Sequence, residues 1–156
     1  MPINPIIAQA VSNRIRVRVC GLLVINDGLL LVNHPGLYGH DFWLPPGGGL
    51  EFGETAAQCL KREFLEECGI MIEPGRFLFT CGVINEPIHA IELFFEVKFI
   101  SGTLITGIDP ERGPDQIISE VKAILDQKDD KILHPLFRQL TKTKEILSLN
   151  GFFELT

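Results

Sequence analysis

The sequence lacks an excess of basic residues. It holds 14 Lys and Arg against 20 Asp and Glu, which gives a net charge of −6 and a pI of about 5.2. Broad nucleic-acid binding needs a basic face, so the charge balance argues against DNA or RNA as a partner. The sequence also has no internal repeat and no low-complexity tract, which argues against a repeat array.

Long hydrophobic runs are missing too. No uncharged stretch reaches the roughly 20 residues that a membrane-spanning helix needs. Residues 1–5 have neither the basic start nor the apolar run of a signal peptide. With 156 residues, 46% hydrophobic and 22% charged, we expect a single domain over residues 1–156, cytoplasmic and without a membrane partner. A monomer and a homodimer both stay open.

Cysteines are few and follow no metal-binding pattern. The four are Cys20, Cys59, Cys68 and Cys81. No two of them form a Cys-x-x-Cys pair, and each lies among apolar neighbours. This predicts buried free thiols in a reducing compartment and argues against a zinc site.

Residues 48–70, in contrast, carry glycines and charged residues at fixed spacings. Apolar residues recur there at a helical spacing, at positions Ala57, Leu60, Phe64 and Cys68. Thr55 is suited to cap the N-terminus of this helix, and Gly69 is suited to end it. The glycines that come before Thr55 predict a flexible loop. We therefore expect a loop followed by a helix.

Three carboxylates crowd on one side of this helix, because Glu63, Glu66 and Glu67 are three and four residues apart. Like charges at these separations repel by roughly 0.2–0.5 kcal/mol per pair. The helix dipole disfavours negative charge near the C-terminal end by about 0.3–1 kcal/mol. A bound cation would remove both penalties, and Mg²⁺ prefers carboxylate oxygens. A solvated acidic face is the alternative, but it would not require glycines and an arginine at set distances.

The segment matches the consensus Gly-x5-Glu-x7-Arg-Glu-U-x-Glu-Glu-x-Gly-U, in which U is a bulky apolar residue. The matching residues are Gly48, Glu54, Arg62, Glu63, Phe64, Glu66, Glu67, Gly69 and Ile70. This consensus is the Nudix box, so the chain resembles the Nudix hydrolase family. Residues 43–48, Trp-Leu-Pro-Pro-Gly-Gly, look like the usual lead-in to the box.

The resemblance implies hydrolysis of a diphosphate linkage in a nucleoside diphosphate linked to another moiety, with water as nucleophile and Mg²⁺ or Mn²⁺ as cofactor. The implied metal ligands are the carboxylates of Glu63, Glu66 and Glu67 and the backbone carbonyl of Gly47. Arg62 would hold a glutamate in place through a charge-assisted hydrogen bond. Gly48 and Glu54 would support these ligands without binding the metal themselves.

A catalytic base is expected among the acidic residues of a distant loop, as is common in the family. Glu111 is our candidate, because it lies in the long polar stretch over residues 101–116. The rival acids are Asp109, Asp115 and Glu120. Glu63 is a further alternative, since a metal ligand can also accept the proton of the attacking water.

Candidate substrate contacts lie outside the box. Arg14, Arg16 and Arg18 alternate along one strand, where we favour a solvated edge-strand face. In the alternative, this stripe holds a substrate phosphate, with Arg18 as the candidate contact. Tyr38 and His40 precede the box and are either substrate contacts or plain surface residues. We expect Trp43, Phe79 and Phe94 to serve packing. In the alternative, Trp43 stacks on a nucleobase.

The remaining pattern predicts mostly strands. Residues 1–13 read as irregular, and the expected strands cover residues 14–25, 29–33, 42–44, 76–84 and 90–100. Residues 26–28 and 85–87 read as turns, residues 34–41 as a loop, and residues 117–118 as a brief strand. Two more helices are expected near residues 119–127 and 135–148. This is an α+β or mixed α/β chain, and the resemblance implies an α/β/α sandwich around a mixed β-sheet.

Residues that follow the box bear on the choice of substrate. Family members that cleave ADP-ribose often carry a proline about fifteen or sixteen residues past the box, and Pro87 lies seventeen past Ile70. Signatures for NADH and coenzyme A substrates are absent. We favour a small-molecule substrate of the ADP-ribose or nucleotide-sugar type. The alternatives are (d)NTPs, with the chain acting as a house-cleaning pyrophosphohydrolase, and a non-catalytic module that senses a nucleotide.

Overall fold

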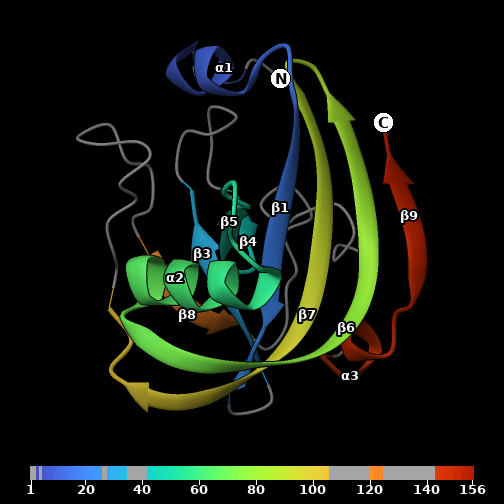
Figure 1. Ribbon diagram of the computed structural model, residues 1–156. Coiled ribbons are helices and arrows are strands. Elements are labelled where there is room, and N and C mark those ends of the chain that lie inside the picture. Colours follow the sequence, from blue (N-terminus) through green and yellow to red (C-terminus); the bar gives the residue numbers. More distant parts are fainter. Residues whose placement is uncertain (1–2, 4, 26–27, 35–41, 106–119, 125–142) are drawn as a thin grey trace.

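The structure is a computed structural model that describes residues 3, 5–25, 28–34, 42–105, 120–124 and 143–156 (Figure 1). The helices in this part of the chain are α1 (Pro5–Val11), α2 (Ala56–Cys68) and α3 (Thr143–Leu147). The strands are β1 (Ile15–Leu22), β2 (Val24–Ile25), β3 (Gly28–Asn33), β4 (Trp43–Leu44), β5 (Gly47–Gly49), β6 (Ile70–Asn85), β7 (Ile88–Gly102), β8 (Glu120–Ile124) and β9 (Gly151–Leu155). None of the described helices is long and apolar enough to cross a membrane.

The larger sheet is mixed and has the strand order β5-β1-β7-β6-β9. β1 runs parallel to β7, and β6 runs parallel to β9, whereas β5 and β6 are antiparallel to their neighbours β1 and β7. The long, curved hairpin of β6 and β7 dominates the view in Figure 1. A mixed α/β fold around a mixed sheet is therefore confirmed.

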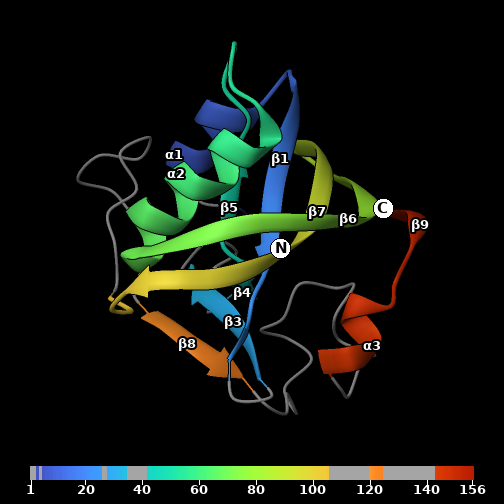
Figure 2. The same cartoon turned by 60° about the horizontal axis from the view of Figure 1, so that its bottom comes forward.

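A smaller sheet is built around β3, which pairs with β2, β4 and β8 (Figure 2). Every residue of β3 is buried. Because side chains alternate along a strand, Leu30 and Val32 enter one hydrophobic cluster while Leu29 and Leu31 enter another. β3 thus joins the two halves of the core.

Local signals in the sequence position α2. Thr55 and Gln58 form a reciprocal capping box, in which Thr55 Oγ1 accepts from Gln58 N–H at 3.1 Å and Gln58 Oε1 accepts from Thr55 N–H at 2.9 Å. Gly69 ends the helix in the left-handed conformation, with φ 71°, and its N–H donates to Leu65 O at 3.1 Å. The predicted helix, its cap and its stop are confirmed.

The two clusters lie on opposite faces of the larger sheet. One contains Leu60 and Phe64 of α2 with Val19 of β1. The other contains the next residue of β1, Cys20, together with Trp43, Phe79, Phe94 and Ile146 of α3. Phe79 and Phe94 are fully buried and stack with ring centroids 4.6 Å apart, so their predicted core role is confirmed. Trp43 is also buried, as expected for packing.

Four expectations about secondary structure are wrong. Residues 5–11 are helical, with Pro5 at the first position, where its missing N–H costs nothing. Residues 120–124 form strand β8, although Val121 and Ile124 have helical spacing, because Glu-Val-Lys-Ala-Ile also alternates and β3 offers it an edge. The expected strand over residues 14–25 is split into β1 and β2. The C-terminal strand β9 was not expected at all.

Two expectations about the box and its approach also need correction. The predicted glycine loop contains a short strand, β5, which pairs with β1. β1 is no edge strand, because it lies between β5 and β7. Its exposed residues are Ile15 and Val17, whereas Arg16 and Arg18 are half-buried. The predicted solvated arginine face is therefore wrong.

Candidate active site

Strand β5 brings Gly47 and Gly48 against the carboxylates of α2. Gly47 N–H donates to Glu67 Oε1 at 3.2 Å. A Cβ atom on Gly48 would collide with the Glu63 carboxylate, and one on Gly47 would collide with Val19 O and lie 2.7 Å from the Cα of Cys20. The glycines are thus required for close approach, which explains why the box places them before its helix.

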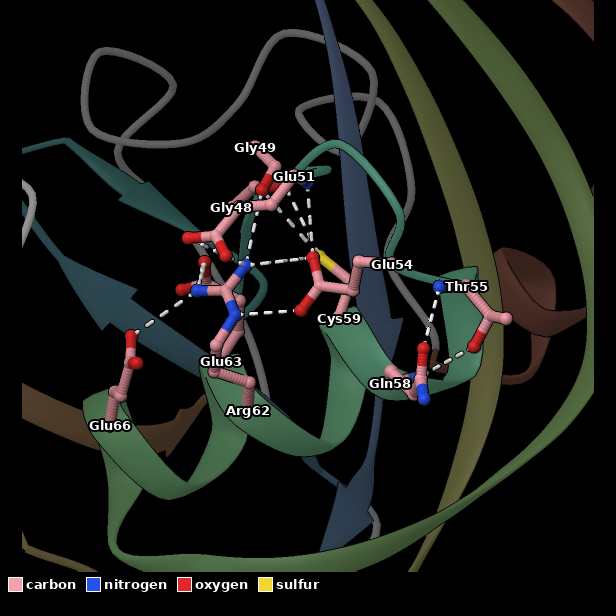
Figure 3. A network of polar contacts seen from close by, with 10 residues as sticks. All are labelled: Gly48, Gly49, Glu51, Glu54, Thr55, Gln58, Cys59, Arg62, Glu63 and Glu66. Atoms are coloured by element: carbon pink, nitrogen blue, oxygen red, sulfur yellow. Dashed lines mark hydrogen bonds and ion pairs between the residues drawn. The ribbon is translucent and has the colours of Figure 1, made fainter.

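Arg62 organises the loop between β5 and α2 (Figure 3). Its guanidinium binds Glu54 as a planar fork, with Nε to Oε1 at 2.8 Å and Nη2 to Oε2 at 3.1 Å. Nη2 also donates to the backbone carbonyl of Gly49 at 3.2 Å. Glu54 in turn accepts from Glu51 N–H at 3.1 Å. The hydrogen bond from Arg62 lowers the pKa of Glu54 below its ordinary value, so this carboxylate is ionised at neutral pH.

The same guanidinium contacts two of the predicted metal ligands. Arg62 Nη1 donates to Glu63 Oε1 at 2.8 Å and to Glu66 Oε2 at 3.4 Å. Figure 3 shows the guanidinium in the middle of these carboxylates and Glu54. Arg62 therefore offsets the mutual repulsion of the acids that the helix brings together.

Glu67 is placed differently from Glu66. It is buried, and its Oε2 atom accepts no hydrogen bond. Burial raises the pKa of Glu67 well above its ordinary value, and the negative charge of Glu63 raises it further. A buried carboxylate oxygen of this kind is costly unless it meets a proton or a cation.

The chemistry of these residues fits a divalent cation. The ligands would be carboxylate oxygens and a backbone carbonyl, which are the hard donors that Mg²⁺ and Mn²⁺ take, and Glu67 Oε2 is available to one. Among the residues that the structure describes, however, no three His, Cys, Asp or Glu side chains are gathered around a point that would hold a metal ion. The contacts give the reason, because Glu63 and Glu66 are both turned to Arg62.

A second charged pair, Arg18 and Glu92, lies on the other face of the larger sheet. Arg18 and Glu92 are directly opposite each other on β1 and β7, and Arg18 Nη1 lies 3.7 Å from Glu92 Oε2. Burial lowers the pKa of Arg18, but its negative neighbours, including Glu92, Glu67 and Glu63, outweigh burial and raise the pKa above its usual range. Sequence reasoning missed Glu92. The available signal was a lone acid in the apolar run Ile-Glu-Leu-Phe-Phe of residues 91–95.

Several predicted site residues lie outside the described part of the chain. These are Tyr38, His40, Asp109, Glu111 and Asp115. Glu120 opens β8, where its backbone pairs with Asn33 of β3. The structure therefore brings together Gly47, Gly48, Glu54, Arg62 and the three helix glutamates, with Arg18 across the sheet.

The four cysteines are buried free thiols, as predicted. Burial raises the pKa of Cys59 and of Cys81 to about 12, and it raises the pKa of Cys20 and Cys68 as well. The thiol form therefore prevails at neutral pH, so none of them is suited to act as a thiolate nucleophile.

Known proteins share this fold. The chain superimposes on an ADP-ribose pyrophosphatase from Streptococcus suis with a TM-score of 0.60 and 16% identity, covering 88% of this chain and 98% of that one. A UDP-X diphosphatase gives a TM-score of 0.64 with 18% identity over 92% of this chain and 70% of that one. A NUDIX hydrolase from Nitrosomonas europaea also gives 0.64, with 18% identity over 90% and 79%. At these identities the likeness shows the fold alone.

Sequence comparison gives a shorter but closer match. An RNA pyrophosphohydrolase from Acinetobacter baylyi is 43% identical over 54 residues, which cover 31% of this chain and 32% of that protein. The match thus spans about a third of the length of this curated relative. The model of the NUDIX domain matches much more of the chain, residues 14–134. Together with the complete box and its placement beside β5, this match shows that the chain belongs to the NUDIX domain family.

Proposed function

We propose that this chain is a pyrophosphohydrolase that cleaves the diphosphate linkage of a nucleoside diphosphate joined to another moiety. The observation that carries the proposal is the buried Oε2 atom of Glu67, which accepts no hydrogen bond and lies on the same helix as Glu63. A structural acid would be hydrogen-bonded or exposed, whereas a metal ligand needs an oxygen that is available.

Glu63, Glu66, Glu67 and the carbonyl of Gly47 would hold Mg²⁺ or Mn²⁺. Such a cation, when bound, polarises a phosphoryl oxygen and lowers the pKa of a bound water. Arg62 and Glu54 keep the ligands in place through their fork, and Gly48 leaves room for Glu63. These roles suit a catalytic site better than a non-catalytic sensor, which would be free to lose the carboxylates.

The base that takes a proton from the attacking water is Glu111 in this proposal, with Glu63 as the alternative. Loss of a general base lowers turnover by roughly 10²–10⁴-fold when chemistry limits the rate. We therefore expect Glu111→Gln to lower turnover in this range with a modest change in KM. A small effect would assign the base to Glu63 or another acid and leave the reaction class unchanged.

We favour an ADP-ribose or nucleotide-sugar substrate, with Arg18, Tyr38 and His40 as contacts. Two structural neighbours support this choice by name, the ADP-ribose pyrophosphatase and the UDP-X diphosphatase. (d)NTPs remain the second candidate class. The acidic charge of −6 argues against RNA, although the curated relative is an RNA pyrophosphohydrolase.

The wider predictions fit this activity. Pairing of β9 with β6 ties the C-terminal strand to the sheet that contains β1, which supports one domain over residues 1–156. The four free thiols support a reducing, cytoplasmic setting. A homodimer stays a prediction.

A substrate panel tests the proposed activity. ADP-ribose, a UDP-sugar, dNTPs and a 5′-triphosphorylated RNA are incubated with Mg²⁺ or Mn²⁺, and the products are identified by mass. Reaction in ¹⁸O-water should place the label on a phosphate product. Label on a sugar carbon, or no cation-dependent turnover of any substrate, would overturn the proposal.

A further inference from the structure

The face of the larger sheet opposite α2 carries charges where a sheet interior is normally apolar. Arg16, Arg18 and Cys20 point to this face of β1, because side chains alternate and Cys20 belongs to the cluster on that side. Glu92 and Phe94 point to the same face of β7 for the same reason. Further along the face, Cys20 and Phe94 are fully buried and apolar. Arg16, Arg18 and Glu92 thus lie at the end of this face where β1 pairs with β5.

The glycine strand β5 lies between these arginines and the carboxylates of α2. A Cβ atom on Gly48 would meet Glu63 on one face, and a Cβ atom on Gly49 would lie 2.9 Å from Arg16 Nη2 on the other. Arg18 is paired with Gly49 in the β1–β5 ladder. Because glycine has no side chain, an anion at this edge of the sheet can approach both faces. Carboxylates therefore flank β5 on one side and guanidinium groups on the other.

The pair of Arg18 with Glu92 differs from an ordinary salt bridge. Its 3.7 Å separation between Nη1 and Oε2 is longer than a hydrogen bond, although the side chains are only 16% and 6% exposed. At this distance the two charges attract each other, but the guanidinium of Arg18 does not bind Glu92 in a planar fork. The carboxylate can therefore limit where the guanidinium points while leaving its fork suited to a ligand.

We infer that Arg16 and Arg18 form a phosphate-binding pair on the face of β5 opposite the carboxylates, and that Glu92 is a positioning residue for Arg18. The inference rests on the proposed function and deepens it, because it assigns the phosphate oxygens of the diphosphate substrate to two guanidinium groups. Guanidinium donates in a planar fork that matches phosphate geometry. Glu92 acts through Arg18 and touches no phosphate itself.

The direction in which Glu92→Gln changes phosphate affinity distinguishes a positioning role of Glu92 from a purely electrostatic one. Replacing Glu92 by Gln removes a negative charge near the bound anion, so Coulomb's law alone predicts tighter phosphate binding. If Glu92 positions Arg18, its loss lets the guanidinium turn away and binding becomes weaker. A purely structural Glu92 would lower thermal stability and leave the affinity of the folded fraction unchanged.

Calorimetric titration with ADP in EDTA tests the pair without a metal. We expect Arg16→Gln and Arg18→Gln each to weaken ADP binding at least tenfold, and Glu92→Gln to weaken it about three- to tenfold. Glu92→Asp keeps the charge and should recover much of the affinity. The matched control is Glu96→Gln on the same strand, because Glu96 faces its own arginine, Arg76, at 3.5 Å. It should leave ADP affinity unchanged.

Kinetics with the substrate that the panel identifies supply a second readout. The arginine variants and Glu92→Gln should raise KM more than they lower kcat. Unchanged or tighter ADP binding in Glu92→Gln would overturn the positioning role, and wild-type affinity in both arginine variants would overturn the phosphate site. Either result can occur while the wild-type enzyme hydrolyses diphosphates. Conversely, ADP binding that depends on the arginines, without any hydrolysis, would refute the proposed function and leave the site standing.

Discussion

Two arginine–glutamate pairs flank strand β5, and they differ in geometry. Arg62 and Glu54 form a fork with hydrogen bonds of 2.8 and 3.1 Å, while Arg18 and Glu92 stand 3.7 Å apart. The first pair joins the loop after β5 to α2, and the second joins neighbouring strands β1 and β7. The chemical groups are the same, so the difference lies in what each pair is built to hold.

The tight pair, Arg62 and Glu54, connects parts of the protein to one another. Arg62 also binds the Gly49 carbonyl and the carboxylates of Glu63 and Glu66. Its N–H groups therefore bind the loop and the candidate metal ligands. In the loose pair, Glu92 keeps the guanidinium of Arg18 close to β5 without binding it in a planar fork. This contrast suggests a division of labour in which one face of β5 places the cofactor ligands and the other face receives the phosphates.

Removing a carboxylate on the α2 side of β5 should have the largest effect on turnover. Glu67→Gln keeps the shape of the side chain but removes the charge from a buried oxygen, so we expect turnover to fall at least tenfold, and on the order of 10²-fold at low Mg²⁺. Affinity for Mn²⁺, measured by electron paramagnetic resonance, should fall in parallel. Glu73→Gln is the control, because Glu73 is exposed and lies 3.8 Å from Lys61. Full activity and unchanged Mn²⁺ affinity in Glu67→Gln would remove Glu67 from the ligand set.

Loosening the tight pair should have the next largest effect. Arg62→Lys keeps the charge but loses the fork to Glu54 and the bond to Gly49 O, so we expect about tenfold lower turnover. Unfolding free energy should fall by about 1–3 kcal/mol, since charge-assisted hydrogen bonds are lost. Denaturant unfolding measures this loss. Lys61→Arg, the reverse exchange at the exposed neighbour, should change neither quantity, and wild-type behaviour of Arg62→Lys would show that the fork is dispensable.

The tight pair was partly predictable because its signals are local. Thr55, Gly69 and the apolar stripe define α2 within a few residues of sequence, and Glu54 comes directly before the cap of the helix that contains Arg62. The expected role of Arg62 in holding a glutamate agrees with its position in the structure, but the partner, Glu54, had to be observed.

The loose pair was not predictable because it depends on strand order. Arg18 meets Glu92 only because β1 lies parallel to β7 in the middle of the sheet, and residues 74 positions apart carry no mutual signal in one sequence. The same cause explains why β1 looked like an edge strand. Strand order also explains β8. Residues 120–124 fit both a helical and an alternating pattern, and pairing with β3 selects the strand.

Two alanine substitutions in β5 compare its two faces directly. Their effects on kcat and KM should be smaller than those of the substitutions above. Gly48→Ala pushes a methyl group into the Glu63 carboxylate, whereas Gly49→Ala meets the end of the Arg16 side chain at 2.9 Å. We expect Gly48→Ala to lower kcat and cation affinity, and Gly49→Ala to raise KM with little change in kcat, each by roughly three- to tenfold. Steady-state kinetics over a range of Mg²⁺ concentrations give both values. Identical effects of the two substitutions would contradict the division between the faces.

The pH dependence of stability gives the finest test of the tight pair. The pKa of Glu54 is lowered in the folded state by the hydrogen bond from Arg62, so its contribution to stability is complete above its unfolded pKa of about 4.3. That contribution is lost as the pH falls through the lower, folded pKa. We therefore expect Glu54→Gln to be less stable than the wild type by about 1–2 kcal/mol at pH 7.

This difference should shrink as the pH falls below about 4, because the wild-type carboxylate then becomes protonated and resembles the amide. Urea unfolding of both proteins between pH 7 and pH 2.5 measures the change. Glu51→Gln is the matched control, since Glu51 is 56% exposed and lies 3.8 Å from Arg62. Its effect should stay within about 0.5 kcal/mol at every pH, as for other exposed ion pairs. A difference for Glu54→Gln that stays constant with pH would mean that the fork contributes through its shape, and that the charge of Glu54 does not stabilise the loop.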